Sequence, residues 1–270
     1  MGQHELGLKF ALILGASSGF GAATSLKLAM EGYHILGVHL DRKATMPAVE
    51  ELINKIVSNN VQAHFFNVNA ADEEKRKEIV KRIRQLIPEG NYIKVFLHSL
   101  AFGTLKPFIG SGRDQVLTQP NLVMTMDVMA HSLVYWVQEL FFADLLGYGT
   151  RIFAMTSHGS ELAVPYYGAV SAAKSALENH IRQLAMELGN MGATAIGLKA
   201  GVTNTPALQK IPGHQGMIDT ALKKNPAERL TTPEDVAKVI YALSSVDAQW
   251  INGQIIGVDY GENVIDRTKI

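Results

Sequence analysis

A tyrosine and a lysine near the middle of the chain form the pair of side chains most able to do chemistry. Tyr167 precedes Lys174 by seven residues, and Ser157 lies upstream of both. Seven residues are about two helical turns, so in a helix the phenol and the ammonium would share one face. A phenol near a cation can stabilise an oxygen that gains negative charge. Such pairs also arise by chance, so their meaning depends on the elements that position them.

Those elements alternate between short apolar runs and longer segments of helical periodicity. Expected strands are residues 10–14, 34–40, 62–66, 94–97, 151–156, 194–198 and 254–258. Expected helices are residues 21–31, 46–58, 72–87, 120–146, 167–189 and 233–244. The alternation predicts an α/β fold of the Rossmann type, a doubly wound parallel sheet of about seven strands with helices on both faces. No repeat or linker divides the chain, so residues 1–270 are expected to form a single domain.

Three glycines connect the first expected strand to the first expected helix with the spacing G-x3-G-x-G. Glycine allows a tight turn and a close approach to pyrophosphate, and a helix N-terminus offers free N–H groups with a positive dipole. This position in the fold predicts a dinucleotide-binding loop. Its cofactor-binding residues would be Gly15, Ser17, Ser18, Gly19, Phe20 and Gly21.

Composition excludes several other classes of function. The chain has no cysteine, which excludes thiolate catalysis, and no spacing of His, Asp and Glu predicts a metal site. Lys+Arg and Asp+Glu both total 25, so no net charge attracts nucleic acid or an anionic membrane. Residues 1–8 carry no apolar stretch of signal-peptide length, and polar residues interrupt the apolar segment 122–146. We expect a cytoplasmic protein without a membrane span.

Further matches in chain order, over about residues 8–262, make the sequence resemble the short-chain dehydrogenases/reductases. The segment GASSGFG is similar to the cofactor loop of that family, and residues 200–205 are similar to its segment after the sixth strand. The resemblance implies contacts with adenine after the third strand and with the nicotinamide carboxamide and phosphates after the sixth. The further cofactor-binding residues that it implies are Asn67, Val68, Ser99, Ala101, Lys174, Gly201, Val202 and Thr205.

The choice between NADH and NADPH depends on charge after the second expected strand. A carboxylate there binds the ribose 2′-hydroxyl, whereas a cation accepts a 2′-phosphate. The position that is usually acidic is His39, and Asp41, Arg42 and Lys43 follow it. We expect NADP(H) rather than NAD(H), with Arg42 as the phosphate ligand. The alternative, that Arg42 and Lys43 are only surface charges, stays open.

The position of the tyrosine resembles the enoyl-acyl-carrier-protein reductases within this family. In the usual family pattern a Tyr precedes the Lys by four residues, but here that position is Val170. A phenol one turn farther away is suited to an enolate oxygen, because hydride adds at C3 of an enoyl thioester while charge collects at C1. The resemblance implies that Tyr167, Lys174 and Ser157 are catalytic. Asp127 and His98 stand where many members have Asn, as in enoyl reductases.

Three hypotheses follow, in decreasing order of preference. The first is an enoyl-thioester reductase that acts on acyl-carrier-protein or coenzyme A substrates in fatty-acid synthesis. The second is a carbonyl or 3-ketoacyl reductase in which Tyr166 or Tyr167 takes the usual role. The third is a catalytically silent dinucleotide-binding protein.

Residues 203–229 are expected to form a mobile lid whose glycines interrupt any helix. The apolar helices at 120–146 and 167–189 predict a homotetramer or homodimer.

Overall fold

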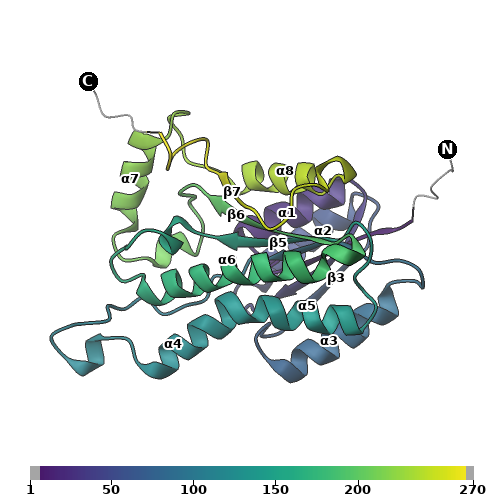
Figure 1. Cartoon of the computed structure of the whole chain (residues 1–270), viewed down its shortest axis with the longest axis horizontal. Coiled ribbons are helices and arrows are strands. Elements are labelled where there is room, and N and C mark those ends of the chain that lie inside the picture. Colours follow the sequence, from purple (N-terminus) through teal and green to yellow (C-terminus); the bar gives the residue numbers. More distant parts are fainter. Residues whose placement is uncertain (1–6, 266–270) are drawn as a thin grey trace.

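A computed structural model describes residues 7–265, and a parallel sheet of seven strands forms its centre (Figure 1). The strands are β1 (Lys9–Leu14), β2 (Tyr33–His39), β3 (Ala63–Asn67), β4 (Ile93–His98), β5 (Arg151–Thr156), β6 (Thr194–Ala200) and β7 (Ile255–Val258). Their order is β3-β2-β1-β4-β5-β6-β7, and each neighbouring pair is parallel. The predicted Rossmann-type fold is confirmed. The order reverses between β1 and β4, which is where such sheets bind ligands.

Each face of the sheet carries its own hydrophobic core, because successive side chains of a strand point to opposite faces. In β1, Leu12 and Leu14 belong to one core, whereas Ala11 and Ile13 belong to the other. A strand buried on both faces has no polar side, which explains why the sequence shows unbroken apolar runs rather than alternation.

Helices cover both faces of the sheet (Figure 1). They are α1 (Gly19–Met30), α2 (Met46–Val57), α3 (Glu73–Leu86), α4 (Gln119–Met126), α5 (Ser132–Phe142), α6 (Gly168–Leu188), α7 (His214–Lys224) and α8 (Pro233–Leu243). Helices α1 and α8 pack against each other on one face, while α3, α5 and α6 contribute to the core on the other. The long helix α6 therefore brings Lys174 underneath the carboxyl ends of β4 and β5.

The expected single helix at 120–146 is wrong in detail. A π-helical segment, Asp127–His131, separates α4 from α5, and the helix ends at Phe142. Asp144 adopts a left-handed conformation with φ of 52°, which ends the helix and turns the chain toward β5. The π-helical segment packs against α6, and π-bulges frequently lie at functional sites.

The segment after β6 also differs from expectation, because residues 214–224 form the regular helix α7 despite Gly216. One glycine costs a helix only about 1 kcal/mol relative to alanine, and the helix starts cleanly from Gly213 with φ of 78°. Within residues 7–265 we find no helix that is long and apolar enough to cross a membrane. Most of the N-terminal stretch 1–8 lies outside the described residues.

Candidate active site

The glycine loop joins β1 to α1, and its backbone lies close to two other loops. A Cβ atom on Gly15 would stand 2.3 Å from the carbonyl oxygen of Ser99, and one on Gly21 would stand 2.0 Å from that of Gly15. Gly19 lies against Thr205, since a Cβ there would be 3.5 Å from its Cγ2. The fold thus brings together predicted cofactor residues from the ends of β1, β4 and β6.

The first turn of α1 fits a pyrophosphate. Ser18 is the N-cap, but its side chain makes no capping hydrogen bond, and the first turn has no acidic residue. The first N–H groups of a helix lack partners within the helix, and the helix dipole favours an anion there. A bound dinucleotide phosphate would satisfy these groups.

The loop after β2 is organised by Asp41. Its carboxylate contacts His39 Nδ1 at 2.9 Å and accepts a hydrogen bond from Thr45 Oγ1 at 2.8 Å, and it is also hydrogen-bonded to Ser17 of the glycine loop. Although burial opposes the effect, these hydrogen bonds hold the pKa of Asp41 below its usual value. Asn67 binds the backbone of Asp41 through both ends of its side-chain amide, at 2.9 and 3.0 Å. Asn67 therefore shapes this loop.

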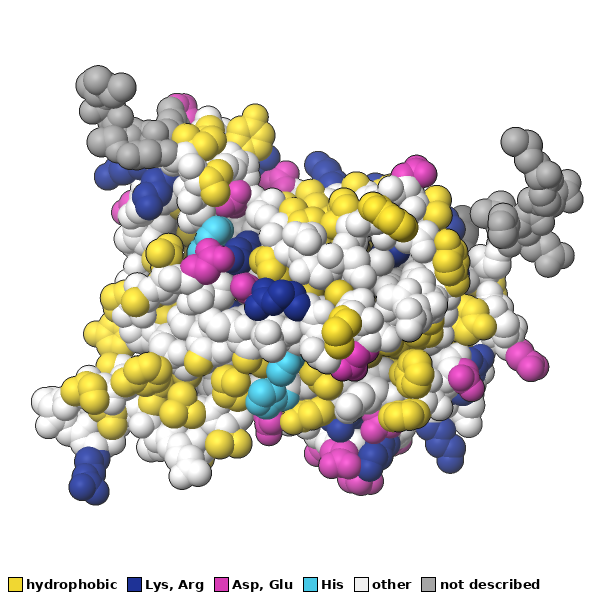
Figure 2. Space-filling view, in the orientation of Figure 1, with side chains coloured by type: hydrophobic (Ala, Val, Ile, Leu, Met, Phe, Trp, Pro, Cys, Tyr) yellow, Lys and Arg dark blue, Asp and Glu magenta, His cyan; other side chains and the backbone are white. Residues whose placement is uncertain are grey.

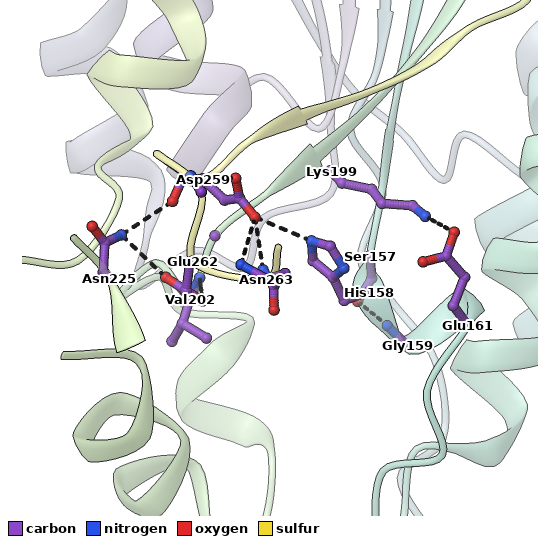
Figure 3. Close-up of polar contacts among 12 residues, drawn as sticks. Ser157, His158, Gly159, Glu161, Lys199, Val202, Asn225, Asp259, Glu262 and Asn263 are labelled. Carbon is purple, nitrogen blue, oxygen red and sulfur yellow. Dashed lines mark hydrogen bonds and ion pairs between the residues drawn. The ribbon is translucent and has the colours of Figure 1, made fainter. Parts of the chain in front are cut away.

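The segment after β6 uses much of its own hydrogen-bonding capacity. The Val202 N–H donates to Glu262 Oε1 at 3.1 Å, so this amide already has a partner (Figure 3). Thr205 Oγ1 accepts from the Leu208 N–H at 3.2 Å, and Thr205 is buried. The position of Thr205 against Gly19 supports a cofactor contact, whereas the Val202 N–H is not available for one.

Ser157 and Tyr167 meet at the turn between β5 and α6. Ser157 accepts a hydrogen bond from the Gly159 N–H at 3.1 Å and starts a short 3-10 turn (Figure 3). The Tyr167 phenol faces Ser157, and both lie against Gly159, where an added Cβ would come within 2.6 Å of the Tyr167 ring and 3.4 Å of Ser157 Oγ. Burial raises the pKa of Tyr167, and the Ser157 hydrogen bond opposes this rise. The phenol remains protonated at neutral pH, as a proton donor must be.

Tyr166 and Tyr167 point in different directions. Tyr166 has φ of 64°, in the left-handed region that a bulky residue rarely adopts, and it is 45% exposed. Tyr167 is the N-cap of α6, one residue before the helix begins. The strained turn places the Tyr166 ring at an open cavity and the Tyr167 ring against Ser157.

An open cavity of about 640 Å³ adjoins this turn and lies beneath α7. Its walls include Pro165 and Tyr166 from the turn, Val202 after β6, and Met217, Thr220 and Ala221 from α7. Most of these side chains are apolar, so the cavity suits an apolar chain.

Lys174 is 4% exposed, and its Nζ donates to the Met155 carbonyl at 2.7 Å. Burial lowers the pKa of Lys174 to about 8, although the nearby Glu178 carboxylate opposes the shift. His98 is fully buried at the end of β4 and contacts Ser132 Oγ at 2.8 Å. Burial and the Lys174 charge lower the pKa of His98 to about 3, so its ring is neutral. Asp127 opens the π-helical segment and accepts a long hydrogen bond from Tyr135, at 3.4 Å.

The C-terminal segment connects α7 with the turn between β5 and α6 (Figure 3). Asp259 lies 3.4 Å from His158 and accepts from Asn263 Nδ2 at 2.8 Å. The Asn225 amide, just after α7, donates to the Asp259 carbonyl at 3.1 Å and approaches Glu262 at 3.4 Å. Sequence reasoning did not find this network, because its members lie far apart along the chain.

Sequence reasoning also missed Glu178, a buried carboxylate one turn beyond Lys174 on α6. Its spacing of four residues from Lys174 places both on one helix face, and this signal was available in the sequence. Among residues 7–265 no group of three or more His, Asp or Glu could hold a metal ion.

Comparison with known protein sequences agrees with this arrangement. Residues 15–263 match the family model described as enoyl-(acyl carrier protein) reductase. The chain is 25% identical over 258 residues to the enoyl-[acyl-carrier-protein] reductase [NADH] of Aquifex aeolicus, a match that covers 95% of this chain and 92% of the relative. It is also 25% identical over 276 residues to a versicolorin reductase of Emericella nidulans, with 96% and 97% covered.

Solved structures show the same fold. The crystal structure of the Aquifex aeolicus enzyme gives a TM-score of 0.82 at 24% identity and covers 96% of this chain and 98% of that one. An enoyl reductase of Anaplasma phagocytophilum in complex with NAD gives 0.79 at 21% identity, with 96% and 93% covered. The chain therefore belongs to the enoyl-(acyl carrier protein) reductase family of short-chain dehydrogenases/reductases, oxidoreductases that use a pyridine nucleotide.

Proposed function

We propose that this protein uses NADPH to reduce the C2=C3 double bond of an enoyl thioester. One observation carries the proposal. Tyr167, seven residues before Lys174, is turned inward onto Ser157, while the position four residues before the lysine is the buried Val170. A proton donor in the usual position for ketone reduction is therefore missing, and the inward phenol stands one turn away from it.

Tyr167, Ser157 and Lys174 have separate roles in the proposed reaction. A bound nicotinamide supplies the hydride, which is expected to add at C3. Negative charge would then collect on the thioester oxygen at C1, where the Tyr167 phenol donates a hydrogen bond, and a proton from solvent added at C2 would complete the saturated thioester. Ser157 orients that phenol. Lys174, fixed by its bond to the Met155 carbonyl, holds the nicotinamide ribose. Its positive charge lowers the cost of developing negative charge nearby.

The cavity beneath α7 supports an acyl substrate. Its apolar walls from Met217 and Ala221 suit a hydrocarbon chain, and the residues 203–229 around it form the proposed lid. We place the protein in the cytoplasm, in fatty-acid synthesis, with acyl-carrier protein or coenzyme A carrying the substrate.

For the cofactor we propose NADP(H), with Arg42 as the 2′-phosphate ligand. Asp41 is the opposing charge, but its carboxylate already has His39, Thr45 and Ser17 as partners. Arg42 is exposed and forms no ion pair with any residue between 7 and 265. A free guanidinium beside the ribose site suits a phosphate, which it can bind in bidentate fashion.

We further propose a homotetramer or homodimer. Hydrophobic side chains gather over α4 and α6 on the face shown in Figure 2, and Val123, Phe141 and Phe142 are exposed on α4 and α5. Hydrophobic side chains exposed together on one face are typical of an interface. Light scattering after size exclusion would give the mass of the assembly, and a monomer at micromolar concentration would contradict the proposal.

A second candidate, carbonyl reduction, is favoured by the names of other relatives. These include the versicolorin reductase and a probable tetrahydroxynaphthalene reductase of Zymoseptoria tritici, 25% identical over 268 residues. Both candidates can be tested by adding crotonyl-coenzyme A or a ketone to the protein and following loss of NADPH absorbance. We expect consumption with the thioester. Consumption with the ketone alone would establish the second candidate, and consumption with neither substrate would favour a silent binding protein.

A further inference from the structure

Three side chains from one stretch of α6 hold the segment that carries Ser157. Lys174 Nζ donates to the Met155 carbonyl at 2.7 Å, ahead of the serine. Ser175 Oγ donates to the Ser160 carbonyl at 2.9 Å, beyond it. The third side chain, Glu178, contacts residues on both sides of Ser157. Helix α6 therefore binds the turn around Ser157 and also carries Lys174.

Glu178 makes the most extensive of these contacts. One carboxylate oxygen, Oε1, accepts hydrogen bonds from Thr156 Oγ1 and from Ser160 Oγ, both at 2.7 Å. The residue is 7% exposed. A buried carboxylate is costly unless it is hydrogen-bonded and near a positive charge, and both conditions hold here. The two hydroxyls belong to the residues directly before and three after Ser157, so Glu178 bridges the turn.

The charges around Glu178 are also buried. Lys199, at the end of β6, places its Nζ 3.7 Å from Glu178 Oε1, and it is also paired with the exposed Glu161 (Figure 3). Lys174 lies one turn earlier on α6, and Glu178 favours its charged form. His98 faces Lys174 from β4 but is neutral. Glu178 is therefore a buried carboxylate that lies 3.7 Å from Lys199 Nζ and one helical turn from Lys174.

We infer that Glu178 is a positioning residue of the active site, which bridges the Ser157 turn and supplies the negative charge that keeps the Lys174 ammonium in place. The inference rests on the proposed roles of Ser157 and Lys174. It does not depend on which acceptor is reduced, because cofactor binding alone reports on Lys174.

The test compares Glu178→Gln with Glu161→Gln. Glutamine keeps one acceptor oxygen but removes the negative charge, so Lys174 should lose its proton at a lower pH. NADPH binding should therefore begin to weaken at a pH about one unit lower than in the wild-type protein. NADPH fluorescence measures this without an acyl substrate, so failure of the enoyl proposal would not obscure it. Turnover with crotonyl-coenzyme A should fall at least tenfold with KM little changed. Glu161→Gln removes only the outer partner of Lys199 and should leave both measurements unchanged. Glu178→Asp should restore the pH limit.

The double variant Thr156→Val/Ser160→Ala tests separately the two hydrogen bonds that Glu178 accepts on either side of Ser157. It also keeps the inference testable if Glu178→Gln does not fold. It removes both donors and keeps the charge, so turnover should fall while the pH limit of NADPH binding stays in place. The inference is overturned if folded Glu178→Gln binds NADPH with the wild-type pH limit. It is equally overturned if the double variant turns over at the wild-type rate.

Discussion

The glycine loop between β1 and α1 and the turn between β5 and α6 lie at the same edge of the sheet but differ in construction. The loop relies on backbone: Gly15 and Gly21 bring main-chain atoms close together, and the first turn of α1 has no acidic side chain. The turn relies on buried side chains, above all Lys174 and Glu178. A loop of bare backbone can bind any nucleotide phosphate, whereas chemistry at one oxygen needs charged and hydroxyl groups fixed in a particular arrangement.

The largest effect is expected from a substitution in the turn between β5 and α6. Tyr167→Phe removes the hydroxyl that we propose donates to the enolate, and general acid groups contribute about 10²–10⁴-fold, so turnover should fall by that order. NADPH affinity should stay within about twofold. Tyr166→Phe alters only the cavity wall, so it should change KM more than kcat. Steady-state kinetics and fluorescence titration measure both variants, and a larger loss of kcat with Tyr166→Phe would exchange the two roles.

The next largest effect is expected from a substitution in the glycine loop, which should weaken NADPH binding. Gly15→Ala introduces a Cβ at a φ of 83° and 2.3 Å from the Ser99 carbonyl, so the loop must move. Strain of about 1–3 kcal/mol would weaken NADPH binding about five- to 150-fold. Gly90 is a matched control, because it has φ of 77° but no atom within 4 Å of an added Cβ. Calorimetric titration of both variants separates the close approach from backbone strain alone, and equal losses of affinity would contradict our interpretation.

The pH dependence connects the two regions, because Lys174 has a proposed role in both. Its pKa of about 8 means that the ammonium is charged below that pH and loses its proton above it. kcat/KM should therefore stay constant as the pH rises to about 8 and then fall about tenfold per pH unit. Rates with saturating cofactor, measured from pH 6 to about pH 10, test this. A profile that stays level to about pH 10 would show that burial does not perturb Lys174.

The smallest effect sharpens the cofactor assignment. Arg42→Ala should raise the KM for NADPH about two- to fivefold, because an exposed ion pair contributes little, and should leave the KM for NADH unchanged. Asp41→Asn removes the opposing charge and should act in the reverse direction. If wild-type protein prefers NADH and Arg42→Ala changes neither value, Arg42 is only a surface charge.

Much of the molecule could be predicted from local pattern. Predicted strands start and end within two residues of the observed ones, because a strand buried on both faces needs an unbroken apolar run. The glycine loop was equally visible, since its function needs residues without side chains at fixed intervals. Both features depend on neighbours in sequence.

Other features depend on neighbours in space and were missed or wrong. Helix α7 forms despite Gly216, since one unfavourable residue does not prevent a helix that starts cleanly and packs over the cavity. The π-helical segment at Asp127–His131 adapts the helix to its packing against α6. The partners of Asp259, among them Asn225 and His158, come from three separate parts of the chain.

The sequence by itself determined the parallel sheet, the phosphate loop and the two-turn spacing of Tyr167 and Lys174, because period and spacing are properties of a single chain segment. Only the tertiary structure decided which of two adjacent tyrosines faces Ser157, and which buried carboxylate lies beside Lys199. The reason is physical. The direction of a side chain and the cost of burying a charge depend on atoms that folding brings together from distant positions.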